Sequence, residues 1–300
     1  EVRVRVHATA LNRADTFQRR GHYPPPEGES EILGLEMAGV VDAVGRGVVE
    51  WEEGDRVCAL LGGGGYAEYA VVHQDMLMAI PPGLSMTDAA AIPEVFLTAF
   101  QAMHWLGDLD GAESALIHAG ASGVGTAALQ LAREAGVTAY ATASAPKHEV
   151  CTRYGAKGVV DYETESFDKN IAEWTDGRGV DLVLDFIGAP YFHKNIASLA
   201  QDGIVVQLAT LGGATVNSVS LRDLMAKRVQ LKASTLRSRA LPYKIRLTKE
   251  FATYALPRFI EGDLEPVIDS VMDWTDVSAA HERMENNENA GKIVLRVVGE

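Results

Sequence analysis

Residues 114–132 read Ser114-Ala-Leu-Ile-His118-Ala-Gly120-Ala-Ser122-Gly123-Val-Gly125-Thr-Ala-Ala-Leu-Gln-Leu-Ala132, and this stretch decides the fold class of the 300-residue chain. An apolar run of strand type leads into three glycines, and an Ala- and Leu-rich run of helix type follows them. Glycines in such a turn let the backbone approach a pyrophosphate, and the free N–H groups at the helix start favour an anion. The spacing is G-x-x-G-x-G rather than G-x-G-x-x-G, so the flanking strand and helix carry the prediction of a dinucleotide site. The alternative is a glycine turn that only packs a helix on a sheet.

Strand-like and helix-like runs alternate through the middle of the chain. A long Ala-rich helix is expected over 89–106, and a further clear helix over 126–135. Alternating units of this length predict a parallel, doubly wound sheet, and so the α/β class. The expected strands are 114–118, 137–141, 158–161, 180–185, 203–209 and 229–235.

The first third of the chain has a different pattern. Short runs of β type are separated by glycine, proline or acidic turns, at 2–8, 37–44, 56–61, 66–72 and 78–80. This pattern predicts a compact antiparallel barrel or sandwich. After a helix-like segment at 277–285, the chain ends with another strand-like run at 292–298.

Composition excludes several classes of partner. The chain carries 41 Asp and Glu against 27 Lys and Arg, a net charge of −14, which disfavours nucleic acid and anionic membranes. Its two cysteines are too few for a disulfide framework or a four-cysteine zinc site. No run of 18 apolar residues is present. A cytoplasmic protein is therefore expected.

The end of the second strand of the parallel sheet predicts the cofactor. Sites for NAD usually have Asp or Glu there, which bonds the adenosine ribose. This chain has no acidic residue in that segment before Glu149, and it has Ser144 and Lys147 instead. With Tyr162, after the third strand, they suit the 2′-phosphate of NADPH. The alternative for Lys147 is an ordinary solvated lysine.

Motifs along nearly the whole chain carry a resemblance to a known family. They are Ala10-Leu-Asn12-Arg13-Ala14-Asp15, Ile32-Leu-Gly34-Leu-Glu36, Ala90-Ala-Ile-Pro93-Glu94, Leu97-Thr98-Ala99-Phe100-Gln101, Leu116-Ile-His118-Ala-Gly120, Ser122-Gly-Val-Gly125-Thr-Ala-Ala, Leu236-Arg237-Ser238-Arg239 and Gly291-Lys292-Ile-Val-Leu. The chain resembles the zeta-crystallin-type quinone oxidoreductases of the medium-chain dehydrogenase/reductase superfamily. Within them it is most similar to the branch of tumour-suppressor-induced quinone oxidoreductases.

The resemblance implies a domain plan and a function. A GroES-like β-barrel domain is expected at 1–93 and 255–300, with the family's first strands preceding Glu1, and a Rossmann NADPH-binding domain at 94–254. The active site is expected in the cleft between them, with NADPH as reductant and quinones as acceptors. A homodimer is expected through the edge strand 229–235 of the Rossmann sheet, which would otherwise stay unpaired.

The resemblance also implies site residues. Tyr23 is expected beside the nicotinamide with Asn12 nearby, Ser122 close to cofactor and substrate, and Thr98 bonded to the carboxamide. Tyr23 as a packed loop anchor and Asn12 as a turn former are the alternatives. The full set of expected cofactor contacts is Thr98, Gly120, Ser122, Gly123, Val124, Gly125, Ser144, Lys147, Tyr162, Gly188, Ala209, Leu236 and Lys292.

No metal is expected. Zinc-dependent relatives hold the catalytic metal with an early Cys and a His-Glu pair, whereas this chain has Asn12 near the first position and Leu35 before Glu36.

Four other features have non-catalytic interpretations. His118 is interpreted as a satisfied strand residue, Arg13 and Asp15 as a solvated or structural pair, and 62–65 as a mobile hairpin at the substrate entrance. The cluster Arg237-Ser238-Arg239 is interpreted as a phosphate site or as part of the cleft edge or subunit interface.

Three functions remain open at this point. The first is NADPH-dependent reduction of quinones, ortho-quinones above all. The second is reduction of the activated double bond of enals or enones. The third is a protein that binds NADPH with little turnover.

Overall fold

The computed structural model describes residues 1–298, which form two compact units with one sheet each. The first unit comprises Glu1–Leu97 and the chain from Leu236 onward, and the second is Thr98–Thr235. The sequence-based bounds differ from these at helix α9 (Leu241–Glu261), most of which was expected in the Rossmann domain. Phe251 and Phe259 of this helix pack against Phe96, with ring centroids 6.2 and 5.1 Å apart. Residues 299–300, the last of the expected range 255–300, lie outside the described residues.

The sheet of the first unit is mostly antiparallel. Its strand order is β12-β13-β1-β2-β3-β5, with β4 also paired to β1. Along β1, Val2, Val4 and Val6 are buried, whereas Arg3 and Arg5 are exposed, so this strand is half-buried as expected. The strands are β1 (Val2–Ala10), β2 (Glu36–Val44), β3 (Arg56–Leu60), β4 (Tyr69–Val72), β5 (Leu77–Ala79), β12 (Ile268–Asp273) and β13 (Lys292–Arg296).

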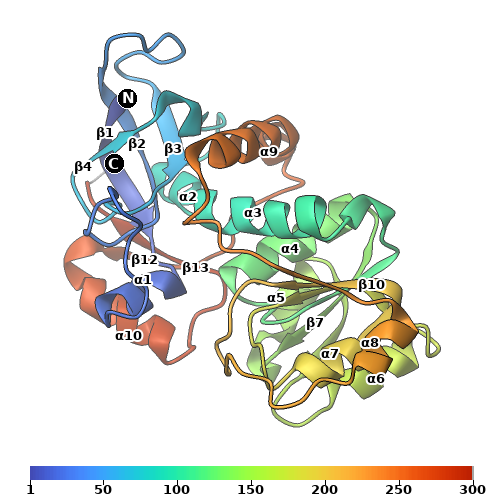
Figure 1. Cartoon of the computed structure of the whole chain (residues 1–300). Coiled ribbons are helices and arrows are strands. Elements are labelled where there is room, and N and C mark those ends of the chain that lie inside the picture. Colours follow the sequence, from blue (N-terminus) through green and yellow to red (C-terminus); the bar gives the residue numbers. More distant parts are fainter. Residues whose placement is uncertain (299–300) are drawn as a thin grey trace. The chain divides into compact units, whose positions relative to one another are not determined.

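Short helices surround this sheet. Helices α1 (Arg13–Arg19) and α10 (Val277–Glu285) come from opposite ends of the chain and lie side by side (Figure 1). Helix α1 begins at Arg13, and its N-cap residue Asn12 donates its backbone N–H to the Asp15 carboxylate at 2.8 Å. The bounds of α10 agree with the sequence-based prediction. Helix α2 (Met86–Ala90) and the 3₁₀ turns η1 (Gln74–Met76) and η5 (Trp274–Asp276) complete the first unit.

The helix expected over 89–106 is broken into pieces. Helix α2 ends at Ala90, and α3 (Pro93–Phe100) begins again at a proline. Proline has no N–H to donate and its ring clashes with the preceding turn, so it suits the first position of a helix rather than its interior. A π-helical segment, η2 (Gln101–Leu106), follows α3 directly.

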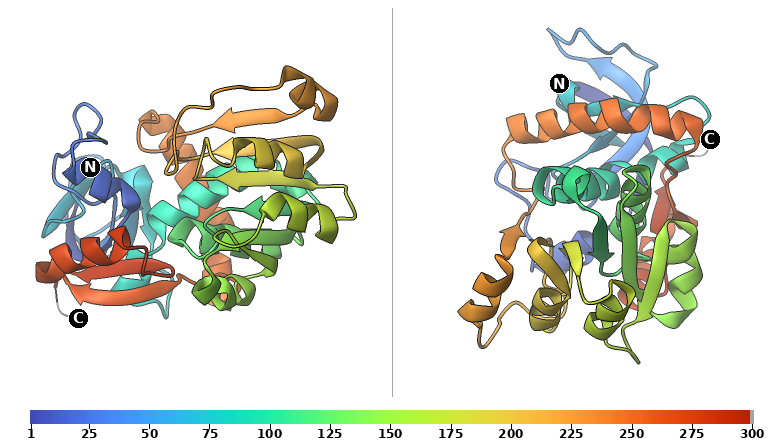
Figure 2. Two further views of the ribbon diagram at one scale, coloured as in Figure 1. Left: turned by 90° about the horizontal axis from the view of Figure 1, so that it is seen from below. Right: turned by 90° about the vertical axis from the view of Figure 1, so that its right-hand side faces the viewer.

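The second unit contains the predicted parallel sheet. All its strands are parallel, in the order β11-β10-β9-β6-β7-β8 (Figure 2). This is the doubly wound order of the Rossmann fold, with its reversal between β6 and β9. The strands are β6 (Ser114–Ile117), β7 (Thr138–Ala143), β8 (Ala156–Asp161), β9 (Val180–Asp185), β10 (Leu199–Gln207) and β11 (Gln230–Ala233).

Helices cover this sheet. Phe167, Ile171 and Ile196 of α6 and α7 pack in one cluster with Leu116 and Val183 of the sheet. Helices α4 and α5 contact β7 and each other. The helices are α4 (Gly123–Glu134), α5 (His148–Arg153), α6 (Phe167–Trp174), α7 (Phe192–Ser198) and α8 (Leu221–Lys227), with 3₁₀ turns η3 (Leu109–Gly111) and η4 (Ala145–Lys147). Within residues 1–298, no helix combines the length and apolar character needed to cross a bilayer.

Candidate functional site

The glycine-rich turn joins β6 to α4 at the point where the strand order reverses. The Gly120 N–H donates to the Thr142 carbonyl of β7 at 2.9 Å, which ties the turn to the neighbouring strand. A Cβ on Gly125 would lie 2.3 Å from the Ala119 carbonyl oxygen, so only glycine fits there. Ser122 is the N-cap of α4, and its Oγ accepts from the Gly125 N–H at 3.1 Å. The first N–H groups of α4 therefore lie at the carboxyl edge of the sheet.

The three residues expected to bind a 2′-phosphate follow adjacent strands. Ser144 follows β7, Lys147 ends the 3₁₀ turn η4, and Tyr162 follows β8. Burial raises the pKa of Tyr162, and Glu163 and Asp161 raise it further. The Ser144 hydroxyl lies close enough to Tyr162 to act on its pKa, which it lowers. The group thus presents hydroxyls and one ammonium with no carboxylate at the end of β7, and its donors fit a phosphate.

Two more expected cofactor contacts end the strands on the other side of the glycine turn. Gly188 follows β9 with a φ of +86°, and Ala209 follows β10. The carboxylate of Asp185, 1% exposed, accepts from the N–H groups of Ile187 at 2.6 Å and Gly188 at 3.2 Å. Asp185 therefore fixes the backbone that carries Gly188.

A buried polar network supports this loop. Asn195 of α7 donates its amide to Asp185 at 2.9 Å, and its Oδ1 lies 2.7 Å from Nε2 of His118. Nδ1 of His118 lies 3.0 Å from the Thr142 hydroxyl. Burial lowers the pKa of His118, so the imidazole is neutral. The interpretation of His118 as a satisfied strand residue agrees with these contacts.

Sequence reasoning missed Asp185 and Asn195. The available signal was an acidic residue that closes the apolar run Val180–Asp185, because polar side chains at the carboxyl ends of such strands lie at the ligand edge of the sheet. Asn195 lies within a helix and gave no comparable signal.

In the first unit, three distant segments meet in a buried ion pair. The Lys292 ammonium donates to Glu36 Oε1, to Asn12 Oδ1 and to the Leu11 carbonyl, each at 2.7 Å. Asn12 also donates its amide to Glu36 Oε1 at 2.8 Å, and the Glu94 N–H donates to Glu36 Oε2 at 2.8 Å. The Lys292 and Glu36 side chains are 3% and 0% exposed. Both carboxylate oxygens and all three ammonium protons are engaged.

This arrangement bears on two expected site residues. Lys292 was expected to contact the cofactor, and Asn12 to lie near the nicotinamide. Here both are internal partners of Glu36, and the Lys292 ammonium has no further proton to donate. Leu236 also belongs to the first unit and is buried, whereas Thr98 is half-buried in the second.

The residues around Glu36 do not fit a zinc ion. The ammonium of Lys292 sits 2.7 Å from the carboxylate and would repel a second cation. Burial raises the pKa of nearby Cys58 to about 12, which keeps the thiol protonated, and zinc binds thiolates. Among residues 1–298, no three His, Cys, Asp or Glu side chains cluster so that they could hold a metal ion.

Tyr23 lies on the loop after α1 and is half-buried. Its hydroxyl makes no hydrogen bond to any residue that the structure describes, whereas its carbonyl accepts from Arg237 Nη1 at 3.3 Å. Burial raises the pKa of the Tyr23 phenol, and the positive charge of Arg237 opposes that shift. An unengaged phenol of this kind is a donor that a ligand carbonyl can accept from.

Asp15 is buried and belongs to a polar cluster between α1 and α10. It accepts from the N–H groups of Asn12 at 2.8 Å and Gly34 at 3.1 Å, and from the Tyr66 hydroxyl at 3.3 Å. Burial raises the pKa of Asp15 to about 6, despite the hydrogen bonds to its carboxylate.

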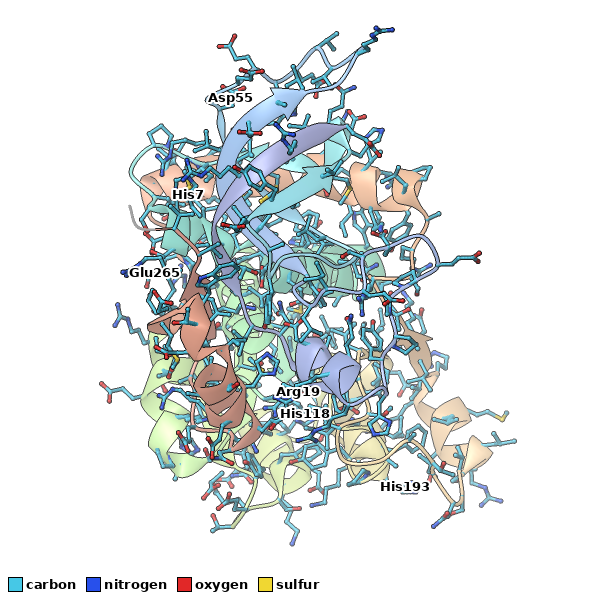
Figure 3. The ribbon with its side chains drawn as sticks, turned by 90° about the vertical axis from the view of Figure 1, so that its left-hand side faces the viewer. His7, Arg19, Asp55, His118, His193 and Glu265 are labelled. Atoms are coloured by element: carbon cyan, nitrogen blue, oxygen red, sulfur yellow. The ribbon has the colours of Figure 1, made fainter. Side chains whose placement is uncertain are left out.

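The expected pair of Arg13 and Asp15 does not form. Arg13 instead donates to the Asn287 side chain at 2.7 Å. Arg19 of α1, labelled in Figure 3, pairs with Glu285 of α10 and lies beside His281. The basic residues of α1 therefore tie this helix to the C-terminal part of the chain.

The glycine segment 62–65 is not the hairpin expected from the sequence, because the strands on either side of it, β3 and β4, do not pair with each other. The Gly64 N–H donates to the Ile32 carbonyl at 2.7 Å, and the Gly65 N–H donates to the Gly34 carbonyl at 3.0 Å. A Cβ on Gly63 would lie 2.3 Å from the Ser30 carbonyl oxygen. The glycines are therefore needed for close packing against residues 29–34.

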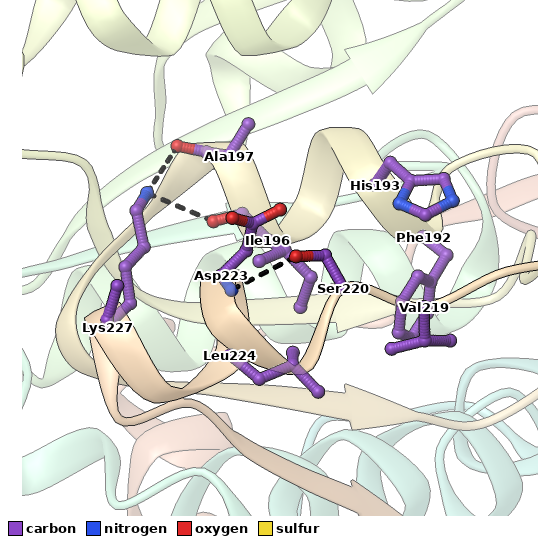
Figure 4. A pocket seen from close by; sticks show the side chains of 10 residues that line it. Phe192, His193, Ile196, Ala197, Val219, Ser220, Asp223, Leu224 and Lys227 are labelled. Atoms are coloured by element: carbon purple, nitrogen blue, oxygen red, sulfur yellow. Dashed lines mark hydrogen bonds between the residues drawn. The ribbon is translucent and has the colours of Figure 1, made fainter.

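A pocket in the second unit lies apart from all these residues. It has a volume of about 260 Å³, smaller than the roughly 300 Å³ of small ligand sites. Lys227 of α8 closes one end by donating to the carbonyls of Ile196 and Ala197 (Figure 4). None of the expected site residues lines this pocket, which is a packing feature between α7 and α8.

Two known protein families match this chain, one over its first residues and one over its second half. Residues 1–82 match the family described as alcohol dehydrogenase GroES-like domain, which confirms the GroES-like fold expected for the barrel. Residues 154–295 match the family described as zinc-binding dehydrogenase.

Two curated relatives cover nearly the whole chain. The synaptic vesicle membrane protein VAT-1 homolog of Rattus norvegicus is 34% identical, over 98% of this chain and 76% of that protein. The quinone oxidoreductase of Pseudomonas aeruginosa is 33% identical, over 98% of this chain and 90% of that protein.

Solved structures with the same fold carry different activities in their names. An NAD-dependent alcohol dehydrogenase is 31% identical with a TM-score of 0.86, covering 99% of this chain and 92% of that one. The CurK enoyl reductase is 29% identical with a TM-score of 0.87, over 98% and 90% of the two chains. A mycobacterial protein in complex with NADPH is 27% identical with a TM-score of 0.88, over 99% and 91%.

Proposed function

Because the chain belongs to the medium-chain dehydrogenase/reductase superfamily, we propose that it is a zinc-independent, NADPH-dependent quinone reductase of the zeta-crystallin type. The observation that carries the proposal is the state of Glu36, whose carboxylate is fully occupied by Lys292, Asn12 and the Glu94 N–H. A site without a Lewis acid suits acceptors that need little activation, and quinones are such acceptors.

The second unit supplies the residues that would hold NADPH. The N–H groups at the start of α4 face the carboxyl edge of the sheet, where a pyrophosphate binds in this fold. Ser144, Lys147 and Tyr162 would hold the 2′-phosphate, and the loop fixed by Asp185 presents Gly188. When bound, NADPH supplies the reducing equivalents.

The first unit supplies the residue that would bind the acceptor. The Tyr23 hydroxyl is free to donate to a quinone oxygen, and its raised pKa keeps it protonated at neutral pH. As the quinone is reduced, negative charge develops on that oxygen, and a hydrogen bond there stabilises the charged form. Ser122 lies in the turn that carries the cofactor and would orient it through the cap of α4.

Reduction of enals or enones is the second candidate. The similarity to the CurK enoyl reductase supports it, and a tyrosine hydroxyl can bond an enone carbonyl just as it bonds a quinone. Quinones are favoured because they need less activation than enones at a site whose Glu36 carboxylate is already occupied by protein donors. An NADPH-binding protein with little turnover is the third candidate.

One experiment ranks these candidates. NADPH oxidation is followed with an ortho-quinone and with an enone, using a single enzyme preparation before and after treatment with a chelator. The proposal predicts faster turnover of the quinone and no loss on chelation. Faster enone turnover supports the second candidate, absence of turnover supports the third, and loss on chelation with recovery by zinc contradicts the proposed metal independence.

We also propose a cytoplasmic homodimer with no nucleic-acid or membrane partner. The net charge of −14 and two buried free cysteines support this setting. The exposed edge strand β11 supports the dimer.

A further inference from the structure

Arg237 connects three segments of the first unit. Its Nε donates to the Gly62 carbonyl at 2.8 Å, its Nη1 to the Tyr23 carbonyl at 3.3 Å, and its Nη2 to the Gln18 side chain at 2.8 Å. The residue is 8% exposed. A planar guanidinium spreads its donors over three nitrogens in fixed directions, whereas a lysine has a single nitrogen at the end of a flexible chain.

The glycine segment that accepts from Arg237 is itself closely packed. The carbonyl of Gly62 belongs to the glycine segment 62–65, which packs against residues 29–34 with no room for a side chain at Gly63. Glu29, beside Gly62, forms an ion pair with Lys244 of α9 at 3.6 Å. Arg237 therefore links the Tyr23 loop to the glycine segment 62–65.

The same guanidinium also faces the phenol. Its central carbon lies 5.2 Å from the centroid of the Tyr23 ring, within the range of a cation–π contact. Of the charges that act on the Tyr23 hydroxyl, Arg237 lowers its pKa and Glu94 raises it. The arginine thus contacts the ring and also acts on the acidity of its hydroxyl.

We infer that Arg237 is a positioning residue that holds the Tyr23 phenol in place for the acceptor's carbonyl oxygen. Three of its five N–H groups donate to protein oxygens and the residue is buried, so we assign Arg237 to the Tyr23 loop rather than to a substrate carboxylate or phosphate. The acceptor class that follows is a neutral carbonyl compound whose oxygen gains negative charge on reduction. The predicted effect of Arg237 on quinone turnover rests on the proposed function. The predicted effect of Arg237 on the pKa of Tyr23 does not.

The test uses a matched control. Arg258 on α9 has the same arrangement, with its guanidinium 3.9 Å from the Tyr254 ring and Nη1 donating to the Tyr254 carbonyl at 2.6 Å. Arg237→Gln, Arg237→Lys and Arg258→Gln are compared by kcat/KM for a quinone with NADPH. The titration of Tyr23 in the free protein is followed by NMR with tyrosine labelled at Cζ, and assigned by Tyr23→Phe.

The inference predicts separate effects. Arg237→Gln should lower kcat/KM by about ten- to hundredfold and raise the pKa of Tyr23, and Arg258→Gln should change neither. Arg237→Lys keeps the charge but not the three bonds, so kcat/KM should fall while the pKa of Tyr23 stays near its wild-type value. In the Tyr23→Phe background, Arg237→Gln should cost less than threefold more, because the two residues act as a unit.

Two results would overturn the inference. One is an unchanged Tyr23 titration in Arg237→Gln, and the other is a full additional rate loss from that variant in the Tyr23→Phe background. If the wild-type protein reduces no quinone, the proposed function fails, and the titration alone still decides whether Arg237 controls Tyr23.

Discussion

Lys147 is the residue through which the choice of cofactor is most directly tested. Replacing it with alanine removes the only ammonium of the group Ser144, Lys147 and Tyr162. A charge-assisted contact to phosphate contributes about 1.5–3 kcal/mol, so Lys147→Ala should raise KM for NADPH by about ten- to hundredfold. KM for NADH, which lacks the phosphate, should stay unchanged, and the effect should shrink at high salt.

The matched control for this prediction is Lys157→Ala. Lys157 is an exposed lysine at the other end of β8 and should affect neither cofactor. Equal weakening of NADPH and NADH in Lys147→Ala would assign Lys147 to the pyrophosphate or to the fold.

Replacing Tyr23 or Ser122 should lower kcat/KM, but only the replacement of Ser122 should also lower stability. Tyr23→Phe removes a hydroxyl with no protein partner, so it should lower kcat/KM by about ten- to hundredfold with no change in Tm. Ser122→Val removes the N-cap of α4 as well, so it should also lower the free energy of unfolding by about 1 kcal/mol. Steady-state kinetics and thermal unfolding on the same preparations check this, and unchanged kinetics in both variants would leave them as packing residues.

Lys292 is the residue whose loss should destabilise the first unit most clearly. Lys292→Met leaves the Glu36 carboxylate buried without a cation, which typically costs about 3–5 kcal/mol. Glu36→Gln in the same chain should recover part of that loss, because a neutral amide costs less to bury. Urea unfolding of the two single variants and the double variant checks this, and a loss below about 1 kcal/mol in Lys292→Met would contradict the ion-pair account.

At the scale of elements, Asp15 couples helix α1 to the segment around Gly34 in a pH-dependent way. Its pKa is about 6 in the fold against 3.8 for the free group, so the folded state binds its proton more tightly. The free energy of unfolding should therefore fall as pH rises from about 4 to about 6, by up to roughly 3 kcal/mol, and stay level above that.

The difference between the wild-type protein and Asp15→Asn isolates this effect. Other groups titrate equally in both proteins, so their difference in stability across this window reports Asp15. A difference that does not change between pH 4 and 6 would show that Asp15 has an ordinary pKa.

Several helices and strands could be predicted because short stretches of the sequence determine them. The α10 helix and the six parallel strands follow from apolar periodicity, and the glycine turn from the spacing of Gly120, Gly123 and Gly125. The helix expected over 89–106 was too long because Pro93 restarts it. Strand β12 and helices α1 and α9 were not predicted. Helix α1 is short and depends on its N-cap, and helix α9 contains Pro257 in its interior.

The candidate sites also divide into a part that could be predicted from the sequence and a part that could not. Ser144, Lys147 and Tyr162 follow neighbouring parallel strands, so the topology brings them to one edge, and the sequence predicted that grouping. Glu36 and Lys292 are 256 residues apart and meet only because β13 pairs with β1, which also pairs with β2. No local pattern reports such a contact, and the roles at the cofactor that the resemblance implies for Lys292 and Asn12 stay predictions.

At the scale of the whole molecule, the edge of the parallel sheet predicts assembly. Strand β11 is the last in the sheet order, and Leu231 on it is 55% exposed. Helix α8, just before it, exposes Met225 at 77%. Light scattering at micromolar concentration should give the mass of a dimer, because a second copy would pair the edge and cover these side chains.

A charge on that edge should separate the copies. Leu231→Glu should give a monomer, whereas Val49→Glu, at an apolar residue 84% exposed in the first unit, should not change the mass. A wild-type monomer would overturn the proposed dimer.

The central claim is reduction of quinones with NADPH at a site that uses no metal. The most direct measurement is the steady-state rate of NADPH and NADH oxidation with an ortho-quinone, using protein freed of metal by a chelator. The account predicts turnover at undiminished rate, with kcat/KM for NADPH above that for NADH by at least about tenfold. No turnover until zinc is added, or a preference for NADH, would contradict it.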